Sequence, residues 1–179
     1  MNKWFLATLL TVFFLAGCGG GGDINIAPVT TDNSNTEIEQ APVAVANPCA
    51  SYENSGGQTI QGVADGANCT YSASFLDAGN PLTVDMTIPA LPNGGAHLFS
   101  GSVFVGRNYD NDADLVAAGI SEGGDGPTLT VEAGATVAFA TSSDFMIINR
   151  GSTLFAVGSL SAPITFTSVS DVNGTVGPE

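Results

Sequence analysis

Basic residues are the scarcest feature of this 179-residue chain, which has three Lys and Arg residues against 17 Asp and Glu and a net charge of −14 at pH 7. Contacts to nucleic-acid phosphates or anionic lipid headgroups need clustered basic side chains, so nucleic-acid binding is almost excluded. Histidine occurs once, as His97, in a segment typical of a strand edge. A Ser-His-Asp or Cys-His arrangement would have to use it, and we expect a structural or exposed residue instead.

Hydrophobic runs long enough to span a bilayer are also lacking, since such a helix needs ~20 apolar residues. The apolar stretch Trp4–Ala16 is shorter, follows Lys3 and ends in small residues. That order of a positive, an apolar and a small-residue region is typical of a secretion signal. We therefore predict a signal peptide at 1–17.

The first of the three cysteines closes this stretch, within Leu15-Ala16-Gly17-Cys18. These residues resemble the lipobox of bacterial lipoproteins. The resemblance implies cleavage before Cys18, acylation of its sulfur and attachment to a membrane, where each buried CH₂ contributes ~0.8 kcal/mol. Because Gly19 follows instead of aspartate, it also implies the outer membrane of a Gram-negative cell, facing the periplasm or the cell surface.

Residues 18–48 have no aromatic side chain and no hydrophobic period, which predicts a flexible tether that separates the domain from its anchor by ~30 Å. Beyond it, Cys49 and Cys69 remain as an even pair in an oxidising compartment, so we predict a disulfide between them. In the chain-entropy model this crosslink stabilises by ~3 kcal/mol. We expect residues 49–100 to form a β-rich cap closed by this bond.

Short runs rich in Val, Ile, Thr and Phe follow, separated by Gly, Pro, Asn and Asp, as in "LTVDMTI", "TLTVEAGATVAFA" and "PITFTS". They predict an all-β fold, with "DADLVAAGI" at 112–120 as an ambiguous helix. An antiparallel β-sandwich and a parallel β-helix both fit such runs. Two strand-turn-strand units, centred on Gly134 and Gly151, and the run at 163–168 favour the β-helix with a spacing of roughly 20 residues.

"LTVEAGATVAF" and "INRGSTLFAVGSLSAPITFTS" resemble the opening coils of a right-handed parallel β-helix of the pectate-lyase-like fold, found in Gram-negative surface proteins. The resemblance implies coils over 101–179. Such proteins normally have many more coils, so we expect a fragment. The fold hosts lyases and adhesins alike and does not define a function. Within the strands, interior stacking is expected for Phe139, Phe145, Phe155 and Phe166.

The most acidic segment contains Asp110, Asp112 and Asp114 in the D-x-D-x-D spacing that opens an EF-hand. Leu115 replaces the glycine of the sharp turn and the acid at the twelfth position is missing, so an EF-hand is rejected. An irregular calcium site with Glu122 or Asp125 remains a hypothesis, with an expected dissociation constant of ~10⁻⁴–10⁻³ M. The alternative is a solvated acidic loop.

Uronate lyases of this fold use a basic side chain as the base, and only Arg107 and Arg150 follow the signal region. We interpret Arg107 as the ion-pair partner of the acidic loop and Arg150 as a turn residue that faces solvent. No catalytic residue is assigned. The sequence favours a lipid-anchored surface scaffold for adhesion or for binding a carbohydrate or protein. The alternatives are the first part of a carbohydrate-active enzyme whose site lies beyond 179, and a calcium-stabilised structural module.

Overall fold

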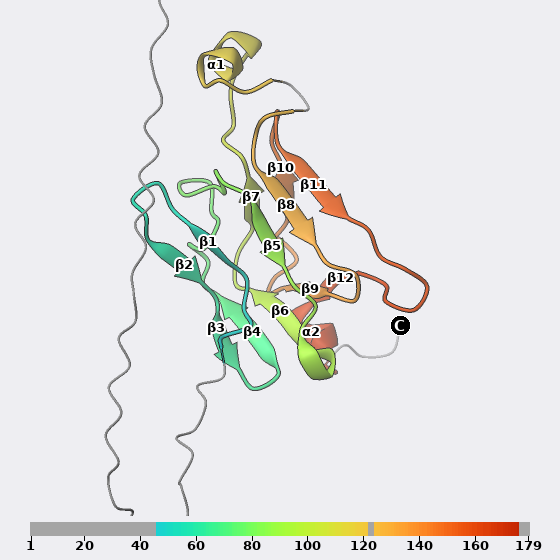
Figure 1. Cartoon of the computed structure of the whole chain (residues 1–179). Coiled ribbons are helices and arrows are strands. Elements are labelled where there is room, and N and C mark those ends of the chain that lie inside the picture. Colours follow the sequence, from blue (N-terminus) through green and yellow to red (C-terminus); the bar gives the residue numbers. More distant parts are fainter. Residues whose placement is uncertain (1–45, 122–123, 176–179) are drawn as a thin grey trace, which may run out of the picture. The chain divides into compact units, whose positions relative to one another are not determined.

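The computed structural model describes residues 46–121 and 124–175 (Figure 1). The signal peptide predicted at 1–17, Cys18 and the tether up to residue 45 lie outside these residues. In the described part the strands are β1 (Ser51–Glu53), β2 (Thr59–Gln61), β3 (Val63–Asp65), β4 (Asn68–Tyr71), β5 (Met86–Ile88), β6 (Ala96–Phe99), β7 (Val103–Val105), β8 (Thr128–Val131), β9 (Thr136–Phe139), β10 (Met146–Ile148), β11 (Thr153–Ala156) and β12 (Thr165–Ser168). The helices there are the 3₁₀ turn η1 (Pro92–Gly94), α1 (Asp112–Ala117) and α2 (Val169–Val172).

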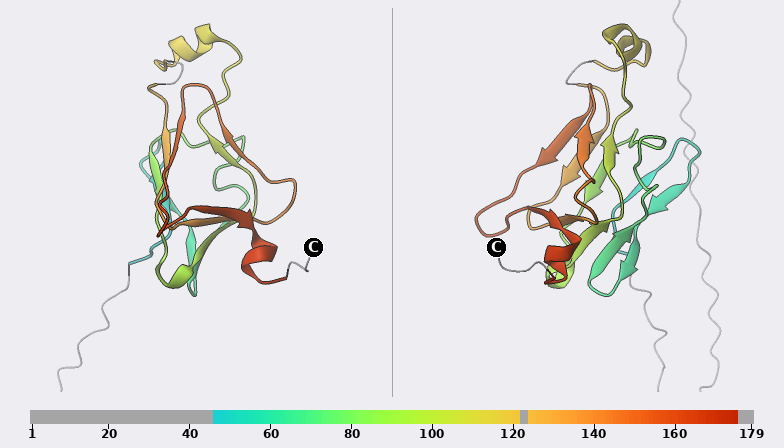
Figure 2. Two further views of the ribbon diagram at one scale, coloured as in Figure 1. Left: turned by 90° about the vertical axis from the view of Figure 1, so that its right-hand side faces the viewer. Right: turned by 180° about the vertical axis from the view of Figure 1, so that it is seen from behind.

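The predicted all-β class is confirmed, and the pairing is mainly parallel. One sheet has the order β12-β9-β6-β4-β3, a second has β11-β8-β5 and a third pairs β10 with β7, to which Leu82 adds a bridge. The chain visits the three sheets in turn, so β6, β7 and β8 form one coil and β9, β10 and β11 the next. The left view of Figure 2 shows it running round three sides. This pairing disagrees with an antiparallel sandwich, because only β1–β2 and β3–β4 are antiparallel among the described strands.

The predicted 20-residue spacing is wrong. Cys69 pairs with His97, Ala96 with Thr136, and Thr136 with Thr165, so successive coils are 28, 40 and 29 residues apart. The long interval includes the loop with α1. Each coil has three corners, and the units centred on Gly134 and Gly151 are different corners that look alike in sequence. Both need a positive φ, 88° and 79°, which glycine adopts without strain.

Side chains that point inward form columns through the coils. The column Tyr71–Phe99–Phe139 stacks aromatic rings, with centroids 4.3 Å apart in the first pair and 6.0 Å in the second. The neighbouring column on the same sheet holds Cys69 and His97, both fully buried. Parallel pairing therefore begins at β4, within residues 49–100, for which a β-rich cap was predicted.

The N-terminal end of the stack is closed by a crosslinked antiparallel segment. The predicted disulfide between Cys49 and Cys69 is confirmed, with the two Cα atoms 5.4 Å apart. Tyr52 packs edge-on against Phe75 at 5.5 Å, and its hydroxyl donates to the Phe75 carbonyl. The β3 strand pairs with the outer edge of β4. These contacts cover the N-terminal end of the first coil.

The predicted interior position is wrong for Phe145 and Phe155, which point outward, whereas Phe166 points inward but is uncovered. Phe139 is half-buried, but Phe145, Phe155 and Phe166 are 51%, 56% and 47% exposed. Phe155 stands in an outward column, in register with Thr130. Phe145 lies against Phe104 outside the third sheet. Phe166 points inward, but β12 is the terminal strand of its sheet among the described residues, so no further strand covers the Phe166 ring.

Candidate binding groove and acidic loop

An open groove of about 610 Å³ runs along the outer side of β5 and β8. Its floor carries Asp85, Thr87, Thr128 and Thr130, and its wall is formed by residues 49–51. In this sheet, inward apolar side chains alternate with outward polar ones, as required for a strand with one buried face. Sequence reasoning missed these residues. The signal was present in the alternation of "DMTI" and "TLTV" at 85–88 and 128–131.

The floor of the groove is a row of hydroxyls held by backbone register. Thr87 pairs with Thr130, and adjacent strands lie ~4.8 Å apart, so their hydroxyls follow one line. Asp85 accepts a hydrogen bond of 2.8 Å from the backbone N–H of Thr128 through Oδ1. This bond fixes the carboxylate beside the row. Phe155 continues the same line on β11 with an exposed ring.

The wall of the groove is held in place by the N-terminal crosslink. Cys49 is tied to β4 by the disulfide, and the Ala50 N–H donates to the Tyr71 hydroxyl at 2.9 Å. Gln61 adds a hydrogen bond from its amide to the Cys49 carbonyl. The position of the wall therefore depends on the disulfide and on its hydrogen bonds to Tyr71 and Gln61.

The chemistry of the groove is that of hydrogen bonding. Of the residues that line it, Asp85 is the titratable one, and Ser51 and three threonines supply hydroxyls that both donate and accept. A proton-transfer reaction needs a second group of matched pKa within reach of the substrate. Hydroxyls, one carboxylate and an exposed ring nearby suit recognition of a polyhydroxylated, uncharged molecule.

His97, the single histidine, is fully buried. Its Nε2 lies 2.8 Å from the Pro89 carbonyl, which can only accept, so Nε2 carries the proton and Nδ1 accepts from the Tyr71 hydroxyl at 2.6 Å. Burial lowers the pKa of His97, outweighing the bond to Pro89. Burial likewise raises the pKa of Tyr71 well above its ordinary value, against the bond from Ala50. The pair is thus a neutral, satisfied link between the first two coils.

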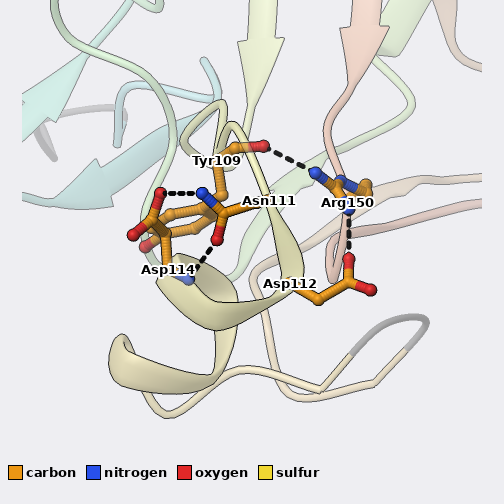
Figure 3. Close-up of polar contacts among 5 residues, drawn as sticks. All are labelled: Tyr109, Asn111, Asp112, Asp114 and Arg150. Atoms are coloured by element: carbon orange, nitrogen blue, oxygen red, sulfur yellow. Dashed lines mark hydrogen bonds and ion pairs between the residues drawn. The ribbon is translucent and has the colours of Figure 1, made fainter.

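The acidic loop begins with an N-capped helix (Figure 3). The Asn111 side chain accepts from the Asp114 backbone N–H at 3.0 Å and donates to the Asp114 carboxylate at 2.8 Å. Arg150, which comes from the turn after β10, forms an ion pair with Asp112 and donates to the Tyr109 carbonyl at 2.9 Å. Negative charge in the first turn also suits the helix dipole.

The interpretation of the two arginines is corrected by this contact. Arg150 is the partner of the acidic loop, although it was expected to face solvent, and Arg107 forms no salt bridge within the described residues. The reason is coil stacking. The neighbouring Asn149 donates to the Gly106 carbonyl of the preceding coil at 2.7 Å, which places Arg150 beside a loop 38 residues away.

The predicted calcium ligands are engaged separately. Asp112 pairs with Arg150, Asp114 with Asn111, and Asp125 accepts from the Ser121 hydroxyl at 2.7 Å. Glu122 lies outside the described residues, and within residues 46–121 and 124–175 no three acidic, histidine or cysteine side chains gather as metal ligands. Calcium binding by Asp110, Asp112, Asp114, Glu122 and Asp125 stays a prediction, tested by the thermal midpoint in millimolar calcium.

Comparisons with known proteins returned no relative: no family model, no curated protein and no solved structure matches the chain. Among the described residues, none of the helices has the length and apolar content to cross a membrane. The groove and the loop are therefore interpreted from their own geometry.

Proposed function

We propose that this chain is an exported, lipid-anchored binding scaffold whose groove over β5 and β8 binds a neutral carbohydrate. The observation that carries the proposal is the line of Thr87 and Thr130 hydroxyls, flanked by Asp85 and continued by the exposed ring of Phe155. Sugars present hydroxyls along their edges and C–H groups on their faces. A row of hydrogen-bonding groups beside an aromatic ring complements both.

The strong acidity supports an uncharged ligand. With a net charge of −14, the chain repels polyanions such as uronate polymers at ordinary ionic strength. The groove itself offers a carboxylate and no basic side chain among the residues that line it. The hydroxyls of a neutral glycan can donate hydrogen bonds to the Asp85 carboxylate without this repulsion. The proposed role is therefore adhesion to, or retention of, neutral polysaccharide.

Export and anchoring rest on the sequence at the N-terminus. Leu15-Ala16-Gly17-Cys18 supports acylation of Cys18, and a disulfide suits an oxidising compartment. A tether over 18–48 would then hold the groove away from the lipid surface. Metabolic labelling with a fatty-acid analogue tests this part directly: the label is expected on the protein and lost with Cys18→Ser. A label that survives this substitution would contradict the anchor.

The scaffold is proposed to be a right-handed parallel β-helix. Three mainly parallel sheets visited in turn and inward columns shared by successive coils support this class. In such a scaffold, outward positions repeat at the strand spacing and line up along the stack. This repetition explains how separate segments, 85–87 and 128–130, supply one continuous binding line.

Binding to a panel of neutral and acidic oligosaccharides tests the proposed function. A neutral member is expected to bind, with affinity reduced about fivefold by Phe155→Ala, Thr130→Val or Asp85→Asn, since each removes a contact of ~1 kcal/mol. Phe145→Ala and Thr136→Val are matched controls on other sheets and should bind normally. Equal losses in the controls, or binding of acidic sugars alone, would contradict the proposal.

A further inference from the structure

Two buried side chains, Tyr71 and His97, connect two residues that line the groove. The Ala50 N–H, on the wall, donates to the Tyr71 hydroxyl at 2.9 Å. This hydroxyl donates to Nδ1 of His97 at 2.6 Å, and Nε2 of His97 donates to the Pro89 carbonyl at 2.8 Å. Ala50 and Pro89 both belong to the lining of the groove. A continuous chain of hydrogen bonds therefore joins two parts of this lining through the interior.

Packing fixes the Tyr71 hydroxyl at the centre of this chain. The Tyr71 ring stacks on Phe99 with centroids 4.3 Å apart and lies against Phe75 at 4.7 Å. Tyr71 and His97 are both fully buried, so water does not replace a bond that either of them loses. The position of Ala50 in the wall therefore depends on this one hydroxyl.

The chain of hydrogen bonds requires a neutral His97. The Tyr71 oxygen accepts from Ala50 while its own proton goes to Nδ1 of His97. A protonated imidazole carries an N–H on both nitrogens, so Nδ1 could no longer accept. The Tyr71 proton would then lose its acceptor, and a buried donor without a partner is unfavourable. Protonation of His97 is thus incompatible with the bonds that hold the wall.

The surroundings of His97 oppose its protonation in the folded chain. Its neighbours from other elements are uncharged, namely Tyr71 and Cys69 on β4, Val137 on β9 and the Pro89 carbonyl after β5. Two carboxylates flank the sheet of β5 and β8: Glu132 accepts from the Ala90 N–H and Asp85 from the Thr128 N–H. Both are exposed and screened by water. Burial therefore dominates and keeps the pKa of His97 below its ordinary value.

We propose that Tyr71 and His97 are positioning residues of the groove, and that acid releases the groove wall by protonating His97. The inference rests on the groove being the ligand site proposed above. A proton taken up from solvent binds Nδ1, and the Tyr71 hydroxyl gives up its bonds to His97 and Ala50. Residues 49–51 are then held by the disulfide and by Gln61 alone. The groove loses its shape, and the neutral polysaccharide is released in acid surroundings.

¹⁵N NMR of the full chain tests this coupling without a ligand. His97 is the single histidine, so its ring nitrogens are assigned directly, and a protonated Nε2 beside an unprotonated Nδ1 is expected at neutral pH. As the pH falls, the Ala50 amide signal should shift with the same midpoint as the ring nitrogens. In Tyr71→Phe the Ala50 amide proton loses its acceptor, so it should exchange about tenfold faster and its shift should no longer follow His97.

Tyr52→Phe is the matched control. It removes a buried hydroxyl from the same N-terminal segment, where this hydroxyl donates to the Phe75 carbonyl. The Ala50 amide and its response to pH should remain unchanged in this variant. His97→Gln is a second test that keeps the Tyr71 hydroxyl, and it should abolish the shift of Ala50 with pH. Circular dichroism verifies the fold of each variant at each pH.

The neutral oligosaccharide selected by the panel tests the consequence for binding. If only the form with neutral His97 binds, the dissociation constant should rise about twofold at the NMR midpoint and about tenfold for each further pH unit. Asp85→Asn removes the carboxylate of the groove and should bind more weakly with the same dependence on pH. Tyr71→Phe should bind more weakly at neutral pH and lose the dependence.

Three results would overturn the inference. They are an Ala50 amide that does not follow His97, an affinity that stays constant across the His97 transition, and unfolding of the chain before His97 is protonated. A panel in which no neutral oligosaccharide binds would contradict the proposed function instead. The NMR experiment would still decide whether His97 controls the wall.

Discussion

The two ends of the stack contain similar inward side chains and differ in what covers them. At the first coil, Cys69 and Tyr71 are buried beneath a crosslinked segment that pairs with β4. At the last coil, Leu154 and Phe166 occupy the same kind of inward column and remain 38% and 47% exposed. In a stacked fold a side chain contributes its full burial free energy only when both neighbouring layers are present. The contribution of a side chain to the free energy of unfolding therefore depends on its position in the stack as much as on its residue type.

Removing the disulfide, which holds the cover of the first coil, is expected to lower the free energy of unfolding more than any other change proposed here. Cys49→Ala with Cys69→Ala should lower the free energy of unfolding by about 3 to 5 kcal/mol, since the crosslink restricts the unfolded chain and holds the covering segment. Urea denaturation of wild type and variant measures this loss. A change below about 1 kcal/mol would mean that the N-terminal segment covers the first coil without the bond.

A matched pair of leucines compares a covered layer with the uncovered one. Leu129→Ala should cost about 3 kcal/mol, because Leu129 is fully buried, whereas Leu154→Ala in the same column should cost less than about 1 kcal/mol. The measurement is urea denaturation of the wild type and of each variant. Equal costs would show that Leu154 is already covered within one chain.

The sequence was sufficient for the class of the fold and for the crosslink. Strand-length runs predicted the all-β structure, and the cysteine count predicted the bond between Cys49 and Cys69. The coil length was not predictable in the same way. Corners at Gly134 and Gly151 both need a positive φ, so they look equivalent in sequence, although the first joins β8 to β9 and the second joins β10 to β11. Local turn chemistry does not specify which strands stack.

The same limit applies to the side chains at the candidate site. The D-x-D-x-D spacing directed attention to Asp110, Asp112 and Asp114, but the partner of Asp112 is Arg150, which is brought near only by stacking of the coils. The groove depends on register between 85–87 and 128–130, which no local motif encodes. Phe155 and Phe166 were expected inside because apolar character alone does not distinguish outward from inward, or covered from uncovered, positions.

Acid should weaken the covered end through His97. Burial holds the pKa of folded His97 below its ordinary value of about 6.5, so the unfolded chain binds the extra proton. The contribution of His97 is complete above pH ~6.5 and is lost as the pH falls toward the folded pKa. The free energy of unfolding of wild type, minus that of His97→Gln, should therefore decrease between pH 7.5 and 5. A pH-independent difference would contradict the buried neutral form.

The ion pair between Arg150 and Asp112 should make the smallest contribution to the free energy of unfolding. The side chains of Arg150 and Asp112 are 38% and 78% exposed, so water screens the ion pair, and the entropy lost in ordering both side chains offsets its attraction. A double-mutant cycle with Arg150→Gln and Asp112→Asn should give a coupling of about 0.5 kcal/mol, decreasing in high salt. A coupling above about 2 kcal/mol that resists salt would instead show a desolvated pair that secures the acidic loop to the stack. The contrast between the ends would then need revision, because the last coil would be held by charge where the first is held by a disulfide.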